Sequence, residues 1–327
     1  RDAQESRGLG DVYKRQVLDR SSLPAVIFYY VMLFSLTFAG GSLKTWLTTH
    51  WGGWHSTARA GGLFILIALT VVTWQAALAA PTGYTELTLL DVGSGDAILL
   101  RSSSGKTVLI DGGPLLSPLS DALGRRLPAF QHHLDYLVIA STSAESLTAL
   151  PRLVERFPPR AVLWAAPAAD SRAARLLQAA LTQAGSPITT ALPGQTLDFG
   201  DGAKLHVTAI GQRGGVLLFE HGSFLALLPL GMDTNLSRLL QEEHSLTPVT
   251  VLLLANSGEA SLNPPAWISR LTPRVILLSV AAGDRYGRPD AEILAALQGY
   301  TLLRTDVNGW IKLSTDGNQL WVEAQKP

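Results

Sequence analysis

Two long stretches near the start of the chain contain no charged residue, and they constrain the fold more than any other feature. The first runs from 23 to 43 and the second from 60 to 80. Each is close to the ~20 residues that an apolar helix needs to cross a bilayer core. Charged residues make up only 16% of the chain, which is low for a water-soluble protein. The sequence therefore predicts two transmembrane helices with a short loop over residues 23–83.

Each stretch has an alternative interpretation. A helix buried in a large core can also be apolar over its whole length. The small residues at 77–80 resemble the end of a signal sequence, although the internal position and the length of this stretch argue against one. Transmembrane helices remain the expectation.

The charges around these stretches predict how the chain is oriented. The loop between them holds Lys44 and Arg59 and no acidic residue, and Glu86 follows the second stretch with no basic residue nearby. Basic loops tend to remain in the cytoplasm. We therefore expect a multi-pass protein of the cell membrane whose C-terminal domain lies on the extracytoplasmic side.

The first residues differ in character from everything that follows. Residues 1–16 resemble translated sequencing-adapter sequence of the kind found at the ends of environmental gene fragments. We expect 1–22 to be a non-native or disordered leader that does not contribute to the fold. The chain is then expected to be the C-terminal piece of a longer protein.

From about residue 84 the pattern changes to short apolar strands separated by turns. Gly-rich turn signals occupy 92–96 and 103–106, between strands expected at 86–91, 97–101 and 107–111. Uninterrupted apolar runs suit strands buried on both faces, and they occupy 134–140, 161–164, 251–254 and 275–280. Hairpins are expected at 216–228 and 310–324.

Helical patterns separate these strands. They cover 145–157, 169–184, 235–243, 264–271 and 289–297. In each half of the domain the strands come first and the helices later. The sequence thus predicts an α/β domain over 84–327, built from two sheets with helices on both outer faces.

Charge and cysteine content restrict the partners. Lys and Arg together number 26, as do Asp and Glu, so no global charge attracts nucleic acid, although a local basic patch is still allowed. The chain has no cysteine, which excludes disulfides and thiolate metal ligands.

Two neighbouring segments carry a family resemblance. Residues 89–100 read LLDVGSGDAILL, and residues 104–113 read SGKTVLIDGG. They closely resemble the C-terminal domain of ComEC-type competence proteins, whose pattern is Leu-Asp-Val-Gly-Gln-Gly-Asp-Ala, then Gly-Lys, then Ile-Asp-Gly-Gly. The segments 285–289 and 303–309 fit the same family, as do two membrane spans before the domain.

The resemblance implies both a fold and a role. The fold would be two transmembrane helices followed by an αββα metallo-β-lactamase-like sandwich. The role would be the terminal part of a channel that passes single-stranded DNA inward during natural transformation. Its partners would be single-stranded DNA, the membrane, the remaining N-terminal part of the channel and other competence proteins. In this family the appended domain is thought to act on DNA with bound Zn or Mn.

The family's metal-binding positions carry other residues in this chain. Its Ser-His-Pro-Asp-Ala-Asp-His-Ile-Gly-Gly-Leu segment aligns with 140–150, its Gly-Asp with 231–233, its Gly-His-His-Gly with 255–258 and its Tyr-Gly-His-Pro with 286–289. The remnant positions, with Asp111, are Ser141, Ser143, Glu145, Ser146, Asp233, Asn256, Ser257 and Arg288. No histidine remains in these segments, so we expect no bound metal and no cofactor.

The remaining residues suggest two kinds of rebuilt active site. Asp96, Asp111, Glu145 and Asp233 could form a loose carboxylate cluster for Mg²⁺ or Ca²⁺. The structural alternative is favoured: Asp96 and Asp111 accept backbone N–H bonds in Gly-rich turns, and Glu145 lies in the first turn of its helix. A serine nucleophile among the clustered serines would lack a histidine base at a matching place.

Basic residues supply candidates for DNA contact. The main ones are Lys106, Arg285, Arg288 and Arg304, and Arg125 and Arg126 are also considered. Guanidinium suits phosphate, and Arg288 would place a fixed positive charge where the family has histidine. The alternative is that these are ordinary solvated surface residues.

Three functions follow from these observations. The first is a DNA-uptake channel fragment whose outer domain is catalytically inactive and binds or guides DNA. The second is an active metal-dependent phosphodiesterase or nuclease with a rebuilt carboxylate site. The third is a membrane-anchored structural module with no DNA role.

Overall fold

The structure, a computed structural model, describes residues 66–71, 83–128, 131–166, 171–242 and 247–326. The chain divides into two compact units, 1–82 and 83–327. Of the predicted spans only 66–71 are described, as helix; the rest of both spans and the leader lie outside the described residues. Within the described ranges, no helix is long and apolar enough to cross a membrane.

The second unit contains an eight-stranded sheet in the order β15-β14-β1-β2-β3-β4-β5-β6. Strand β1 pairs antiparallel with β2 and β14, whereas β3 to β6 run parallel. The strands are β1 (Thr85–Leu89), β2 (Ile98–Arg101), β3 (Thr107–Ile110), β4 (Leu134–Ile139), β5 (Pro159–Trp164), β6 (Ile188–Thr190), β14 (Ile311–Thr315) and β15 (Leu320–Ala324).

A seven-stranded sheet faces the first, in the order β13-β12-β11-β10-β9-β8-β7. Strands β7 to β10 form antiparallel pairs, and β10 to β13 run parallel. The strands are β7 (Thr196–Asp198), β8 (Ala203–Ile210), β9 (Gly215–His221), β10 (Phe224–Leu228), β11 (Val251–Leu253), β12 (Val275–Leu278) and β13 (Leu302–Arg304).

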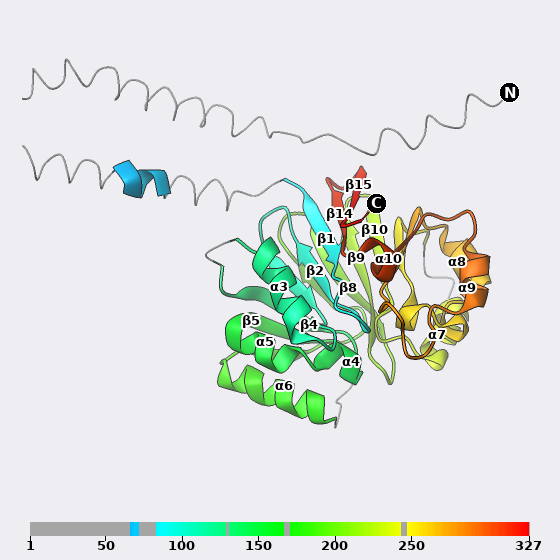
Figure 1. Cartoon of the computed structure of the whole chain (residues 1–327), viewed down its shortest axis with the longest axis horizontal. Helices are drawn as coiled ribbons and strands as arrows, with labels where there is room; N and C mark the ends of the chain where they lie inside the picture. Colours follow the sequence, from blue (N-terminus) through cyan, green and yellow to red (C-terminus); the bar gives the residue numbers. More distant parts are fainter. Residues whose placement is uncertain (1–65, 72–82, 129–130, 167–170, 243–246, 327) are drawn as a thin grey trace, which may run out of the picture. The chain divides into compact units, whose positions relative to one another are not determined.

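Helices cover the outer faces of both sheets (Figure 1). The first sheet carries α3 (Leu116–Arg126), α4 (Ala144–Leu147), α5 (Leu150–Arg156) and α6 (Arg172–Gln183). The second carries α7 (Thr234–Glu242), α8 (Pro265–Leu271) and α9 (Ala291–Ala296). Short turns complete the fold: α10 (Thr305–Asn308), η1 (Ala255–Ser257) and η2 (Ala260–Leu262).

Three apolar clusters show why this layering is stable. The central one lies between the sheets and includes Leu87 and Ile110 from the first sheet and Leu205 and Phe219 from the second. A second cluster lies beneath α3, α5 and α6, and a third lies beneath α7 and α8. The order helix, sheet, sheet, helix is the αββα arrangement that the sequence predicts for 84–327, and its mixed sheets are consistent with a metallo-β-lactamase fold.

The helical prediction for 145–157 needs a correction. The segment forms two helices, because the first ends at Leu147 and α5 starts afresh at Leu150 with Pro151 in its first turn. Proline has no N–H to donate to the preceding turn, so a continuous helix through Pro151 would lose a hydrogen bond. The sequence also predicts no element at 116–126, where the structure has α3.

The strand directions bring seven loops to one end of the sandwich. The loops after β1, β3, β4, β10, β11 and β12, and the turn before β9, lie at this end. An isolated bridge between Ser141 and Gly214 joins the two sheets there. A Cβ atom on Gly214 would lie 2.0 Å from the carbonyl oxygen of Ala140, so only glycine allows this approach.

Candidate functional site

A small hollow of about 50 Å³ lies where these loops meet. We call it the hydroxyl hollow, because serine side chains from two loops line it. Its lining consists of Gly95, Asp96, Ser141, Ser143, Glu145, Ser146, Arg213, Leu230, Met232, Asn256 and Ser257. The structure thus brings together seven of the positions that the sequence singled out, from the turn after β1, the β4–α4 segment and the turn after β11.

The side chain of Asp111 binds the backbone of the loop that follows β4. Its backbone is left-handed (φ 54°), its side chain is fully buried, and one carboxyl oxygen accepts from the backbone N–H groups of Ala140 at 2.8 Å and Ser141 at 3.3 Å. The other oxygen has no partner among the described residues. Burial raises the pKa of Asp111 well above its ordinary value, and the charge of Asp96 adds to the shift. Asp111 therefore accepts backbone N–H bonds as predicted, but from a neighbouring strand rather than from its own turn.

The three serines after β4 form a local hydrogen-bond network. Ser143 is the N-cap of α4 and accepts from the backbone N–H of Ser146 at 3.1 Å. The hydroxyls of Ser143 and Ser146 are 2.9 Å apart, and the hydroxyl of Ser141 accepts from the N–H of Ser143 at 3.2 Å. These hydroxyls organise the helix start and bind one another.

Asp96 is the second buried carboxyl of the site. Its side chain is 8% exposed, and burial raises its pKa from 3.8 to about 7, with a hydrogen bond from Ser279 opposing the shift and the charge of Glu145 adding to it. The preceding Gly95 has φ +82°, and a Cβ there would lie 2.7 Å from the carbonyl oxygen of Glu145. The Gly-rich turn therefore presses Asp96 against the start of α4, where it has little access to water.

Glu145 is held by an arginine from a distant loop. Its carboxylate pairs with the guanidinium of Arg285 at 2.5 Å, and Arg285 also lies over the ring of Tyr286, 4.6 Å from its centroid. As the sequence predicted, Glu145 lies in the first turn of α4. Arg285 is one of the predicted DNA-contact residues, and Glu145 neutralises its positive charge within the domain.

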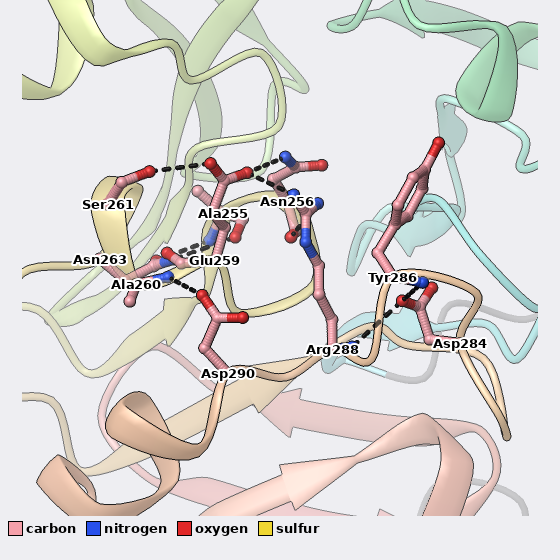
Figure 2. Close-up of polar contacts among 10 residues, drawn as sticks. All are labelled: Ala255, Asn256, Glu259, Ala260, Ser261, Asn263, Asp284, Tyr286, Arg288 and Asp290. Carbon is pink, nitrogen blue, oxygen red and sulfur yellow. Dashed lines mark hydrogen bonds and ion pairs between the residues drawn. The ribbon is translucent and has the colours of Figure 1, made fainter.

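The turn after β11 is braced by side chains from both sides (Figure 2). Asn256 and Ser257 both adopt left-handed backbone angles, φ 48° and 56°. Asn263 accepts from the N–H of Ala255 at 2.8 Å and donates to the carbonyl oxygens of Ala255 and Glu259. The turn is thus rigid without a ligand.

Arg288 closes this turn from the opposite side. Its guanidinium donates to the carbonyl oxygen of Asn256 at 3.1 Å and pairs with the carboxylate of Glu259 at 2.6 Å (Figure 2). The Asn256 side-chain amide donates to the same carboxylate at 2.5 Å. The positive charge predicted at this position is present, but Glu259 neutralises it.

Asp233 does not line the hydroxyl hollow. Its carboxylate caps the start of α7 by accepting from the N–H of Leu236 at 2.8 Å and also accepts from the N–H of Gln212 at 2.8 Å. These backbone bonds lower its pKa, although burial opposes the shift. Met232, the residue before Asp233, lines the hollow instead.

The remaining basic candidates lie elsewhere. Lys106 is in the β2–β3 turn, at the far end of β3 from Asp111. Arg304 ends β13 and forms a two-pronged pair with Asp306, with distances of 3.0 and 2.6 Å. Neither residue lines the hydroxyl hollow.

The donors in the hollow do not fit a hydrolytic metal site. Such sites need three or more imidazole or carboxylate donors for each ion, and a serine hydroxyl remains protonated near neutral pH. Glu145 is engaged by Arg285, and Asp96 and Asp111 hold protons more tightly than ordinary carboxyls. In the part of the chain that the structure describes, no group of three or more His, Asp or Glu side chains is placed to hold a metal ion.

The hollow also offers no base for a serine nucleophile. No histidine is among its lining residues. The ring of His206 is engaged in β8, where its two nitrogens lie 2.8 Å from the Thr196 hydroxyl and 2.9 Å from the Glu220 carboxylate. A serine next to a base, the arrangement that nucleophilic catalysis requires, is therefore missing from this hollow.

Sequence reasoning missed three lining residues: Arg213, Leu230 and Met232. Arg213 lies in the β8–β9 turn, and its carbonyl oxygen accepts from the N–H of Thr142 at 2.9 Å and from the Thr142 hydroxyl at 3.0 Å. The glycines around it signal a turn, but only the bridge between the sheets shows that this turn meets the loop after β4.

Comparisons with known proteins find similarity in structure alone. No protein-family model and no curated protein matches the chain. The solved structures that resemble it include YhfI from Bacillus subtilis, a metallo-β-lactamase-fold protein, at 12% identity and a TM-score of 0.47 over 68% of this chain and 95% of YhfI. CmlA, a diiron β-hydroxylase from Streptomyces venezuelae, has 16% identity and a TM-score of 0.43, with 71% of this chain and 54% of CmlA covered. Zn-bound PqqB from Methylobacterium extorquens has 10% identity and a TM-score of 0.44, with 64% and 85% covered.

Proposed function

We propose that this chain is the C-terminal part of a membrane channel for DNA uptake, and that its αββα domain binds or guides DNA without cleaving it. The uptake role rests on the motif resemblance at 89–113 and 285–289, and on the two uncharged stretches before the domain. The inactivity rests on one observation: serine hydroxyls line the hollow at the loop end where a related hydrolase would hold its metal.

The chemical reason is the supply of a nucleophile. Water's own pKa leaves too little hydroxide at neutral pH, and metal-dependent phosphodiesterases overcome this by binding the water to a metal ion. The hydroxyls of Ser141, Ser143 and Ser146 bind backbone groups or one another and cannot replace such a ligand set. Arg213, which lines the hollow, could stabilise negative charge, but charge stabilisation without a nucleophile does not cleave the strand.

The proposed location follows from the charges of the loop between the spans. Lys44 and Arg59 favour a cytoplasmic loop, which puts the domain on the extracytoplasmic face of the cell membrane, where incoming DNA arrives. The remaining part of the channel and other competence proteins would be its partners. A reporter that is active only in the cytosol, fused after Pro327, should be silent; strong activity would reverse the proposed topology.

The decisive test is a cleavage assay on the full chain. With Mg²⁺, Mn²⁺ or Zn²⁺ added, we expect no cleavage of single- or double-stranded DNA, while salt-dependent binding of single-stranded DNA persists. An Asp111→Asn variant, which keeps a hydrogen-bond acceptor but loses the carboxylate, is the matched control. Cleavage that this change abolishes would establish the rebuilt carboxylate site instead, and absence of binding at low salt would leave a membrane-anchored structural module.

A further inference from the structure

A second and larger cleft, of about 600 Å³, lies on the outer face of the first sheet. Strands β1, β2 and β14 form its floor and α3 forms one wall, and we call it the α3–β14 cleft. It shares no lining residue with the hydroxyl hollow. Its volume falls within the roughly 300–1,000 Å³ of typical small-molecule sites.

Four basic side chains line this cleft: Arg101 from β2, Arg125 and Arg126 from α3, and Lys312 from β14. Lys312 pairs with Glu323 at 2.7 Å. None of the three arginines forms an ion pair with any residue that the structure describes. In this they differ from Arg285, Arg288 and Arg304, each of which is paired with an acid.

Two of these arginines, Arg125 and Arg126, are consecutive in α3, and both side chains line the cleft. Arg125 is exposed, whereas Arg126 is partly buried and donates to the carbonyl oxygen of Ala122 at 3.1 Å. Burial lowers the pKa of Arg126 and the charge of Arg125 lowers it further, while Glu323 opposes the shift. A bound anion would relieve this repulsion, and guanidinium groups match phosphate oxygens in geometry.

An aromatic ring lies against Arg126. The guanidinium of Arg126 lies over the ring of Trp310, 4.7 Å from its centroid, and both residues line the cleft. Leu99 adds apolar surface to the lining. An aromatic face next to arginine is the combination on which the bases of nucleic acids stack.

Three acidic residues also line the cleft: Glu86, Asp91 and Asp121. They have no ion-pair partner among the described residues. Their presence disfavours a ligand that is only an anion, such as inorganic phosphate. It suits a ligand that also carries N–H or O–H donors, because an ionised carboxylate only accepts hydrogen bonds.

We propose that the α3–β14 cleft binds a nucleoside phosphate, either free or as one unit of a single strand. Arg125 and Arg126 engage the phosphate, Trp310 packs against the base, and the carboxylates accept from the sugar hydroxyl or base amino groups. The proposal adds a binding site away from the hydroxyl hollow and does not depend on the proposed role in DNA uptake.

The test is fluorescence anisotropy of a labelled short single-stranded oligonucleotide with the full chain. Arg125→Glu should weaken binding about tenfold or more, because the variant places a carboxylate against phosphate. Trp310→Ala should weaken it by about fivefold or more, through lost stacking. Arg238→Glu, an exposed position on α7 outside the cleft, is the matched control and should leave the affinity unchanged apart from the small effect of net charge.

Competitors distinguish the sources of the ligand. Displacement by an unlabelled nucleoside monophosphate assigns the free nucleotide, and displacement by an unlabelled strand alone assigns the polymer. Equal displacement by inorganic phosphate or by vesicles of anionic lipid would overturn the proposal, since neither carries a base. Equal weakening by Arg125→Glu and Arg238→Glu would overturn it as well. Cleavage of DNA would end the proposal of an inactive domain without bearing on this cleft. Strand binding that neither Arg125→Glu nor Trp310→Ala weakens would overturn the proposal for this cleft and leave DNA binding elsewhere on the domain.

Discussion

The hydroxyl hollow and the α3–β14 cleft treat charge in opposite ways. Around the hollow, Glu145 is paired with Arg285 and Glu259 with Arg288, and the two remaining carboxyls are buried. In the cleft, Arg101, Arg125 and Arg126 have no acidic partner among the described residues. The comparison teaches that the charged groups around the hollow are engaged within the fold, while the charged groups free to meet a ligand lie on another face. Substitutions in the hollow should therefore change stability, and those in the cleft should change binding.

The largest expected effect is a pH dependence of stability caused by Asp96. Its pKa in the folded protein is about 7, against 3.8 for the ordinary group, so between these values the folded state keeps a proton that the unfolded chain has lost. The contribution of Asp96 to the free energy of unfolding should therefore be greatest below pH 4. This contribution should fall by about 4 kcal/mol as the pH rises to 7.

Urea unfolding of the full chain at about pH 4.5 and about pH 7.5 checks this sign. Asp96→Asn, which stays neutral, should flatten the slope without removing it, since Asp111 acts in the same direction. An unchanged slope in Asp96→Asn would show that Asp96 is not the source, and would weaken the description of the hollow as a structural region.

Asp111→Ala should be the most destabilising single substitution around the hollow. It removes the acceptor for the N–H groups of Ala140 and Ser141 and places alanine at a left-handed position, at a cost of about 3 kcal/mol. Asp111→Asn keeps an acceptor oxygen and tolerates the backbone, so its loss of stability should be smaller. An equal loss for both variants would mean that the carboxyl group itself is required.

Arg288→Ala should cost about 2 kcal/mol, because it leaves the half-buried Glu259 carboxylate without its guanidinium partner. Glu259→Gln, which retains a hydrogen-bond acceptor, should cost less. A double-mutant cycle measures the coupling. Independent, additive effects of the two changes would show that the pair does not stabilise the turn after β11.

The smallest expected effect is that of a chelator. Because no described group of side chains is placed to hold a metal ion, EDTA should leave the thermal midpoint of the chain unchanged. A clear drop that Zn²⁺ or Mn²⁺ restores would contradict the assignment of the hollow as a structural region.

The sequence predicts the apolar strands and most helices, but it misses strands β6, β7, β8 and β13 and helix α3. Strand segments such as 107–111 and 134–140 are mostly apolar and bounded by Gly-rich or polar turns, so their signal is local. Helix α3 buries only Leu119, Ser120 and Leu123, which is too narrow a stripe to recognise among the prolines and glycines of that segment. Its position depends on the sheet beneath it.

The site shows a similar limit. Ser141, Ser143 and Ser146 could be placed together, because they follow one strand and share a helix start. The partners of the arginines could not, since Glu145 and Arg285 are 140 positions apart and Arg288 and Glu259 are 29 positions apart. The alignment at 231–233 offers either Met232 or Asp233 for the family's aspartate, and only its hydrogen bonds show that Asp233 caps α7.

The placement of β14 and β15 has a consequence for how the domain is made. Strand β1 opens the domain, and its outer neighbour β14 is synthesised more than two hundred residues later. Until then one edge of β1, Thr85–Leu89, offers unpaired backbone groups to any other extended chain. A chain whose synthesis stops before Ile311 would expose this edge. Such truncated chains would tend to associate with one another. Because of this strand order, we expect the chain to need chaperones while it is being synthesised.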